Sequence, residues 1–274
     1  MFYNAAMNTI LKNTVRDWPV TALICAAGVG ARAGGDIPKQ YQLIHGLPML
    51  WQTIRAFAEC PELARVNVVI SPNDEWFAEV VRPHIAERGW AERVIILPVG
   101  GATRAESVRN GLAELYDQLL DDEDAWVMVH DAARPCVTES AIMRLRDTVW
   151  QQAEIMMSQS GEWQNVGGIL AQPVTDTVKL SQNGQHIKKT LDRSTLWAAQ
   201  TPQMFTVSSL YNALCDALVD PDIAQTITDE ASVMEWAGFQ PLLVNGEARN
   251  LKVTYPQDFE LAGFYLSDSF DTSY

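Results

Sequence analysis

The chain has 274 residues and a mass of 30.5 kDa; 47% of its residues are hydrophobic and 20% are charged. This composition predicts a globular protein with one large core and excludes disordered and collagen-like classes. With 20 Lys and Arg against 34 Asp and Glu, the formal net charge is −14. That charge excludes a nucleic-acid polymer as partner, because binding a duplex requires the neutralisation of many phosphates.

The four cysteines and four histidines show no spacing that is typical of a zinc site or a disulfide framework. We therefore expect a reducing, cytoplasmic environment. No run approaches the roughly 20 apolar residues that a membrane helix needs. Polar side chains interrupt residues 1–19 before any signal-peptide core could form. We expect residues 1–19 to be an extension that precedes the fold.

From Val20 onward, short apolar runs alternate with longer helical patterns. The runs lack polar alternation, which is typical of strands buried on both faces. The expected strands are residues 20–26, 66–70, 94–97, 126–129 and 166–171. The expected helices are residues 49–60, 75–87, 104–119 and 139–153. This order predicts an α/β fold with a doubly wound, mostly parallel sheet and helices on both faces.

We expect one domain over residues 20–267, followed by a tail of residues 268–274. In sheets of this kind, ligands bind at the carboxyl ends of the strands. The functional residues are therefore sought just after the expected strands.

Residues 175–190 break the strand–helix alternation. Asn183-Gly184 suits a type I′ turn between two short strands. Pairing outward from this turn sets Leu180 opposite Ile187 and Lys179 opposite Lys188. The strands are too polar for a buried sheet, so we expect a β-hairpin arm over about residues 175–195 that projects from the domain. Since an isolated hairpin is marginal in water, we expect a second subunit to support it in a homodimer.

The loop after the first expected strand, residues 26–35, is rich in glycine. Glycines let backbone N–H groups approach phosphate oxygens, and Arg32 and Lys39 add cations suited to a triphosphate. Residues 28–33 also fit a dinucleotide fingerprint, but the glycines and proline that follow would break the helix this fingerprint needs. A turn with two solvated cations is the alternative.

Asp131 follows a buried apolar run and is a candidate ligand for Mg²⁺, which takes one or two carboxylates plus substrate phosphate. A loop-capping aspartate is the alternative, and Arg134 is ambiguous in the same way. We expect His130 to pack rather than to catalyse. The glycines of residues 100–107 would let backbone groups contact a base edge, or they form a plain strand-to-helix turn.

Further polar clusters follow along the chain, and Thr228-Asp229-Glu230 is typical of a helix N-cap with acidic residues in the first turn. The other clusters are Asp176-Thr177, Asp192-Arg193, Thr201-Pro202-Gln203 and Asn250-Leu251-Lys252-Val253-Thr254.

Together these segments resemble the 2-C-methyl-D-erythritol 4-phosphate cytidylyltransferase family of the non-mevalonate isoprenoid pathway, from about Val20 to Leu266. The segments are Ala26-Ala27-Gly28-Val29-Gly30-Ala31-Arg32, Pro38-Lys39-Gln40-Tyr41, Arg104-Ala105-Glu106-Ser107-Val108, Val129-His130-Asp131-Ala132-Ala133-Arg134-Pro135, Asp192-Arg193, Thr201-Pro202-Gln203 and Thr228-Asp229-Glu230-Ala231-Ser232. The chain departs from the family before Val20, around residues 156–165, and at Ala102, where relatives often carry a polar residue.

The resemblance implies a nucleotidyltransferase-like fold, CTP as substrate, methylerythritol phosphate as acceptor, Mg²⁺ as cofactor and a homodimer. The residues with implied catalytic roles are Arg32, Lys39, Arg193 and Lys252. Those implied to bind the nucleotide are Ala26, Ala27, Gly28, Gly101, Ser107 and Asp131, of which Asp131 also serves the metal. Those implied to bind the acceptor are Arg134, Thr177, Arg193 and Lys252.

The implied reaction is attack by the acceptor's phosphate on the α-phosphate of CTP, which needs positioning and charge stabilisation more than a covalent nucleophile. Because the net charge is −14, a local cluster of cations must attract the nucleotide. A cytidylyltransferase for another polyol phosphate, such as ribitol 5-phosphate, is an alternative. A non-catalytic nucleotide-binding regulatory module and a dinucleotide-dependent oxidoreductase are the others.

Overall fold

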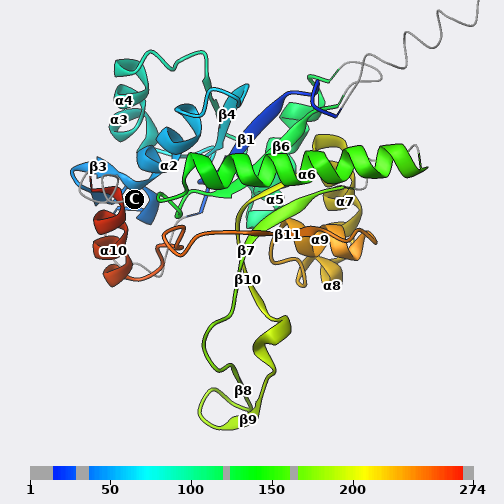
Figure 1. Cartoon of the computed structure of the whole chain (residues 1–274). Coiled ribbons are helices and arrows are strands. Elements are labelled where there is room, and N and C mark those ends of the chain that lie inside the picture. The colour runs from blue at the N-terminus through cyan, green and yellow to red at the C-terminus, as the bar shows by residue number, and fades with distance from the viewer. Residues whose placement is uncertain (1–14, 29–36, 120–123, 161–165, 268–274) are drawn as a thin grey trace, which may run out of the picture.

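The computed structural model describes residues 15–28, 37–119, 124–160 and 166–267, and a seven-stranded sheet forms its centre (Figure 1). Across the sheet the strands are β11 (Leu242–Asn245), β7 (Gly168–Pro173), β10 (Trp197–Thr206), β6 (Trp126–Asp131), β1 (Val20–Cys25), β4 (Arg65–Val69) and β5 (Val94–Leu97). Neighbouring strands are parallel except at β10, which runs antiparallel to both β6 and β7.

Helices cover both faces of the sheet, which confirms the doubly wound α/β prediction. One face packs against α2 (Met49–Ala58), α3 (Phe77–Val80), α4 (Arg82–Glu87) and α6 (Glu139–Ser160). The other packs against α5 (Arg104–Tyr116), α7 (Val207–Ala217) and α9 (Glu230–Trp236). The remaining helices are α8 (Pro221–Ala224), α10 (Pro256–Leu266) and the 3-10 helices η1 (Lys39–Tyr41) and η2 (Arg193–Thr195). The remaining strands are β2 (Leu43–Ile44), β3 (Leu47–Pro48), β8 (Lys179–Ser181) and β9 (Ile187–Thr190).

The central strands are apolar on both faces because each face is covered. In β1, Ala22 and Ile24 pack into the core on the α2 and α6 side, whereas Leu23 packs into the core on the α5 and α7 side. All three side chains are fully buried. This two-residue alternation between two cores explains why the strand sequence shows no polar alternation.

The chain order creates a crevice between β1 and β6. From β1 the chain moves outward to β4 and β5, and α5 then carries it back to β6 on the other side of β1. The connections after β1 and β6 therefore diverge, and this point is where open α/β sheets bind ligands.

The expected single helix over residues 75–87 is wrong, because the structure has two short helices there, α3 and α4. Pro83 lies in the first turn of α4. Proline has no N–H to donate and clashes with the preceding turn, so a continuous helix would be strained at this residue.

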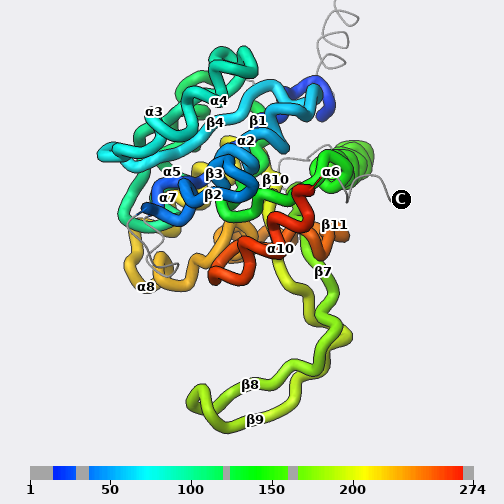
Figure 2. Tube along the Cα trace, turned by 90° about the vertical axis from the view of Figure 1, so that its left-hand side faces the viewer, coloured from blue at the N-terminus to red at the C-terminus, as the bar shows by residue number. Residues whose placement is uncertain are grey.

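The hairpin arm is present, and β8 and β9 extend away from the body of the molecule (Figures 1 and 2). Its expected register is wrong: Lys179 pairs with Thr190, Leu180 with Lys189 and Ser181 with Ile187.

The side chain of Asn183 explains the difference in register. Asn183 Oδ1 accepts hydrogen bonds from the backbone N–H groups of Gln185 at 3.1 Å and His186 at 3.0 Å. Gly184 has a φ of 79° but Asn183 has no positive φ, whereas a type I′ turn needs positive φ at both residues. An Asx turn has replaced the two-residue turn.

Across the described segments, no helix combines the length and the apolar character needed to cross a membrane.

Candidate active site

A cavity of about 510 Å³ opens at the carboxyl ends of β1 and β6, where the crevice lies. Eight of the residues implicated from the sequence line it: Ala26, Ala27, Gly28, Lys39, Gly101, Ser107, Asp131 and Lys252. These residues come from five separate places in the chain, namely 26–28, 39, 101–107, 131 and 252, so the fold brings them together. Arg32 lies outside the described residues, and its role stays a prediction.

Gln40 fixes the start of the glycine-rich loop. Its side chain is buried, and its Nε2 donates hydrogen bonds to the carbonyl oxygens of Ala26 and Gly28, both at 2.9 Å. The backbone of residues 26–28 is therefore held in place before any ligand binds. We did not predict this role of Gln40 from the sequence, although Gln40 stands next to Lys39 in the Pro38-Lys39-Gln40-Tyr41 segment.

The segment before α5 forms the opposite wall through a close approach of two backbones. A Cβ atom on Gly100 would lie 2.3 Å from the Cβ of Ala27, so only glycine lets these loops meet. Ser107 Oγ accepts from the N–H of Gly101 at 3.0 Å and donates to the carbonyl of Thr103 at 2.9 Å. Residues 100–107 form a strand-to-helix turn that lines the cavity, and contact of its glycines with a base edge stays a prediction.

Asp131 lies among three cations. Its Oδ1 accepts from Arg104 Nε at 2.9 Å, its Oδ2 accepts from Lys252 Nζ at 2.8 Å, and Arg134 Nε lies 3.8 Å from Oδ2. Burial alone would raise the pKa of Asp131, but the charges of Arg104, Lys252 and Arg134 hold this pKa well below its usual range. Asp131 is therefore an anion throughout the physiological pH range.

His130 supports the turn that carries Asp131. Its Nε2 lies 3.1 Å from the carbonyl oxygen of Arg134, so this nitrogen carries the proton and donates it. Its Nδ1 then accepts from Thr201 Oγ1 at 3.0 Å, and that oxygen accepts from the N–H of Asp131 at 3.1 Å. Burial lowers the pKa of His130 to about 4, so the ring is neutral and packs, as expected.

The two lysines converge from different elements. Lys39 Nζ donates to the carbonyl oxygen of Val253 at 2.6 Å, and Lys252 is the preceding residue. Arg134 donates through NH1 to the carbonyl of Asn250 at 2.7 Å. The segment over residues 250–253 therefore links the η1 lysine to the turn after β6, and both ammonium groups face one cavity.

Thr177 and Arg193 lie on the arm rather than at the cavity of their own chain. Both are exposed, and Arg193 NH1 donates to the carbonyl of Thr175 within the arm. The arm points away from the body in both views (Figures 1 and 2).

Asp131 is the one carboxylate among the described residues that line the cavity. Both of its oxygens accept hydrogen bonds from cations, so it does not by itself form a resident Mg²⁺ site. One carboxylate supplemented by substrate phosphates does match how Mg²⁺ binds with nucleotides. The role of Asp131 as a metal ligand stays a prediction.

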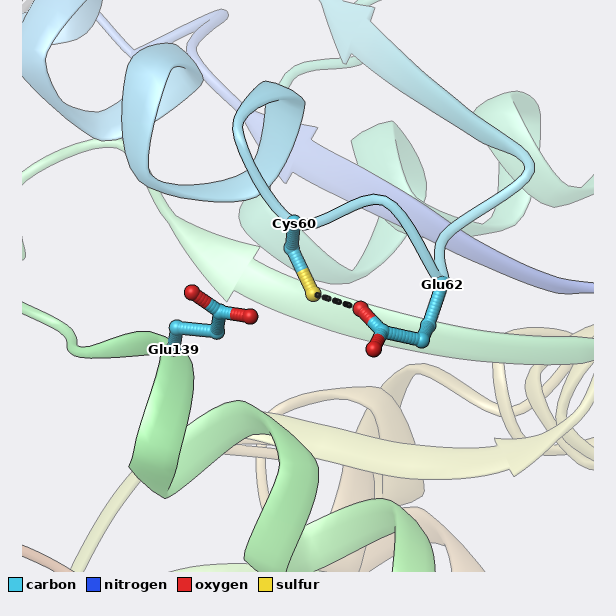
Figure 3. Close-up of side chains that lie close together, drawn as sticks. All are labelled: Cys60, Glu62 and Glu139. Carbon is cyan, nitrogen blue, oxygen red and sulfur yellow. Dashed lines mark hydrogen bonds between the residues drawn. The ribbon is translucent and has the colours of Figure 1, made fainter.

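A second grouping of potential metal ligands lies elsewhere, at Cys60, Glu62 and Glu139 (Figure 3). Burial raises the pKa of Cys60 to about 11, so this side chain is a neutral thiol, and it donates to Glu62 Oε2 at 3.5 Å. A hydrogen-bonded thiol beside two exposed carboxylates is explained without a metal.

A doubly wound sheet with a cation-rich cavity at its switch point defines a nucleotidyltransferase-like α/β protein. The family model for 2-C-methyl-D-erythritol 4-phosphate cytidylyltransferase matches residues 20–268. The chain therefore belongs to the 2-C-methyl-D-erythritol 4-phosphate cytidylyltransferase family.

Individual relatives agree over nearly the whole chain. A protein of that description from Ralstonia nicotianae is 48% identical over 252 residues, covering 92% of this chain and 93% of the relative. One from Chromobacterium violaceum is 44% identical, covering 90% and 97%. A crystal structure of 4-diphosphocytidyl-2C-methyl-D-erythritol synthase is 39% identical with a TM-score of 0.70, covering 91% of this chain and 99% of that one.

Proposed function

We propose that the protein transfers the cytidylyl group of CTP to 2-C-methyl-D-erythritol 4-phosphate, releasing pyrophosphate. The observation that carries this proposal is the convergence of Lys39 and Lys252 with Asp131 in one cavity at the β1/β6 crevice. Membership of the family supports the choice of both substrates.

The reaction needs charge stabilisation where negative charge develops. The acceptor's phosphate oxygen forms a bond to the α-phosphorus of CTP as the bond to the β-phosphate breaks, so charge moves onto pyrophosphate. Lys39 and Lys252, with Arg32, stabilise that charge. A phosphate anion needs no general base, which is consistent with a buried, neutral His130.

We propose that Mg²⁺ enters with the triphosphate of CTP and that Asp131 is its protein partner. When bound, the ion would neutralise phosphate charge and so favour attack at the α-phosphorus. For its part, Asp131 holds Lys252 at the cavity through their 2.8 Å ion pair.

Replacing Asp131 with Asn separates these two roles. The amide keeps the shape but loses the charge, so we expect kcat to fall by about tenfold or more. If Asp131 binds the metal, the Mg²⁺ concentration for half-maximal activity rises as well. If that midpoint is unchanged while kcat falls, Asp131 acts on Lys252 alone and the metal role is wrong.

The substrate proposal is tested by pyrophosphate release from CTP with Mg²⁺ and one acceptor at a time. Methylerythritol phosphate should support turnover, and ribitol 5-phosphate should not. Turnover with ribitol phosphate alone would reassign the acceptor. CTP binding without pyrophosphate release from either acceptor would favour the regulatory module.

We propose further that the enzyme is a homodimer in which the arm completes the partner's site, with Thr177 and Arg193 binding the acceptor together with Arg134 and Lys252. The exposure of both arm residues supports this arrangement. We also propose a cytoplasmic location, which the four free cysteines support.

A further inference from the structure

A buried ion pair behind the cavity wall joins the first residues of two helices. Arg104 begins α5 and lines the cavity, whereas Glu230 begins α9. Arg104 NH1 donates to Glu230 Oε1 at 2.6 Å, and NH2 donates to Oε2 at 3.0 Å. The Glu230 side chain is only 2% exposed.

The helix start alone does not explain why Glu230 is buried. Asp229 already caps α9 by accepting from the N–H of Ser232 at 2.9 Å. An acidic residue in the first turn interacts with the helix dipole even when it is exposed. Burying an ion pair carries a desolvation cost that the attraction often only offsets. The orientation of Glu230 toward Arg104 therefore needs another explanation.

The geometry of the guanidinium connects this pair to the candidate catalytic groups. The two bonds to Glu230 orient the guanidinium so that Arg104 contacts Asp131 through Nε alone, at 2.9 Å from Oδ1. Asp131 Oδ2 is then left for Lys252 Nζ at 2.8 Å. Burial acts to lower the pKa of Arg104, but the charges of Glu230 and Asp131 raise this pKa well above its ordinary value, so the guanidinium stays charged. Burial raises the pKa of Glu230, and the charge of Arg104 opposes that rise.

We propose that Glu230 is a positioning residue that keeps Arg104 from capturing both oxygens of Asp131. A guanidinium released from Glu230 would be free to turn and offer Asp131 a two-bond fork, because paired N–H groups match a carboxylate. That fork would take Oδ2 from Lys252 and release the lysine from the cavity. This inference rests on the proposed function for its kinetic test only.

The kinetic test is a double-mutant cycle between Glu230→Gln and Lys252→Ala. In the wild-type background, Glu230→Gln should lower kcat by about tenfold and change the KM for CTP by less than about threefold, because the nucleotide-lining backbone is untouched. In the Lys252→Ala background the same substitution should change kcat by less than about twofold, because the lysine it acts through is gone. Equal losses in the two backgrounds, or full kcat in a folded Glu230→Gln enzyme, would overturn the proposal.

Glu235→Gln is the matched control, since Glu235 is an exposed carboxylate on the same helix. It should leave kcat, KM and the melting temperature unchanged. Removing one partner of a buried pair destabilises proteins, so Glu230→Asp replaces Glu230→Gln in both measurements if the glutamine variant does not fold. The shorter Asp side chain keeps the charge but cannot accept both hydrogen bonds from Arg104. We therefore expect a smaller fall in kcat, which again nearly disappears in the Lys252→Ala background.

A second measurement does not depend on turnover. The ion pair with Asp131 protects Lys252 from amine-reactive reagents, so Lys252 should be modified faster in Glu230→Gln than in the wild type. Peptide mass spectrometry measures the rate of this modification. Lys189 on the exposed arm is the internal reference. Unchanged labelling of Lys252 would overturn the inference even if the wild-type protein proved inactive. A wild-type protein that fails to turn over, with faster labelling in the variant, would instead overturn the proposed function alone.

Discussion

At the scale of single residues, the candidate site depends on how charges are paired. Asp131 binds Arg104 and Lys252 through different oxygens, and Lys39 is tied by its Nζ to the backbone at Val253. The protein itself therefore holds these cations in place, and under the proposed function little reorganisation is needed when charge develops on phosphate. Under the proposed function, this local arrangement attracts CTP despite the net charge of −14.

Replacing Lys39 with Ala should lower kcat by at least about tenfold while the protein stays folded, because charge-assisted contacts to phosphate strengthen in the transition state. The same result is expected for Arg32→Ala. Pyrophosphate release and a thermal melt provide the two measurements. Arg82→Ala is the control, since Arg82 is an exposed cation on α4. Wild-type kcat in the Lys39→Ala enzyme would remove this lysine from the mechanism.

His130 should make folding stability depend on pH. Its pKa is lowered from 6.5 to about 4 in the folded protein, so the unfolded chain binds the proton more tightly. The stability that neutral His130 contributes is therefore present above pH 6.5 and is lost as the pH falls toward 4. The shift corresponds to at most about 3 kcal/mol.

Urea unfolding of the wild type and of His130→Gln at pH 7.5, 6 and 5 measures this contribution. Glutamine does not titrate, so the stability of the variant should fall less steeply with decreasing pH. Parallel pH curves for the two proteins would show that His130 does not bind its proton more weakly on folding.

Site residues could be predicted where a local sequence pattern marks them, and could not be predicted where only a tertiary contact brings them together. Lys39 and Asp131 follow recognisable strand ends or glycines, so their positions at a ligand-binding edge could be predicted. Glu230 and Arg104 carry only helix-start signals, and their mutual contact spans 126 positions along the chain. Local sequence patterns do not predict a contact between residues so far apart in the chain.

At the scale of elements, strands buried on both faces were the most predictable. The apolar runs that became β1, β4 and β5 match the predicted bounds to within one residue. By contrast, β10 was not predicted, because it starts as an exposed continuation of the arm and contains Pro202. Polar residues and a proline are features that argue against a central strand, and here tertiary packing outweighs them.

The close approach of two loops makes Gly100, the neighbour of cavity-lining Gly101, the most sterically restricted glycine before α5. In Gly100→Ala the new Cβ would meet the Cβ of Ala27 at 2.3 Å and the carbonyl oxygen of Ile70 at 2.9 Å. We expect a loss of about 1–3 kcal/mol in unfolding free energy and a raised KM for CTP. Thermal melts and CTP titrations measure both.

A second substitution checks the cause of that loss. Ala27→Gly removes the Cβ of Ala27, which is one of the two atoms that the new side chain would meet. The double variant Gly100→Ala/Ala27→Gly should therefore have a higher melting temperature than Gly100→Ala alone. If it recovers nothing, the contact with Ala27 is not what excludes a side chain at residue 100.

At the scale of the whole molecule, the arm is the feature that a single chain leaves unexplained. Leu180 and Ile187 are 39% and 65% exposed, and every residue of β8 and β9 is exposed. A two-stranded hairpin is marginal in water without packing. A second copy of the chain would supply that packing and would receive Thr177 and Arg193 at its cavity.

This arrangement predicts complementation between two inactive proteins. Lys39→Ala disables the body and Arg193→Ala disables the arm, so a mixed dimer has one site with both substitutions and one site with neither. Mixing the two proteins should restore activity, approaching half the wild-type rate per mixed dimer, because each site combines one chain's body with the other's arm.

Recovery requires exchange of subunits, so mixed dimers must first be isolated with two different affinity tags. The control is a mixture of Lys39→Ala with Lys252→Ala. Both substitutions change the body, so every site of that mixed dimer is damaged and no activity should return. Isolated Lys39→Ala/Arg193→Ala mixed dimers that stay inactive, or a monomer with full activity, would contradict a site shared between subunits. Activity restored in the control mixture would contradict the assignment of Lys39 and Lys252 to one cavity.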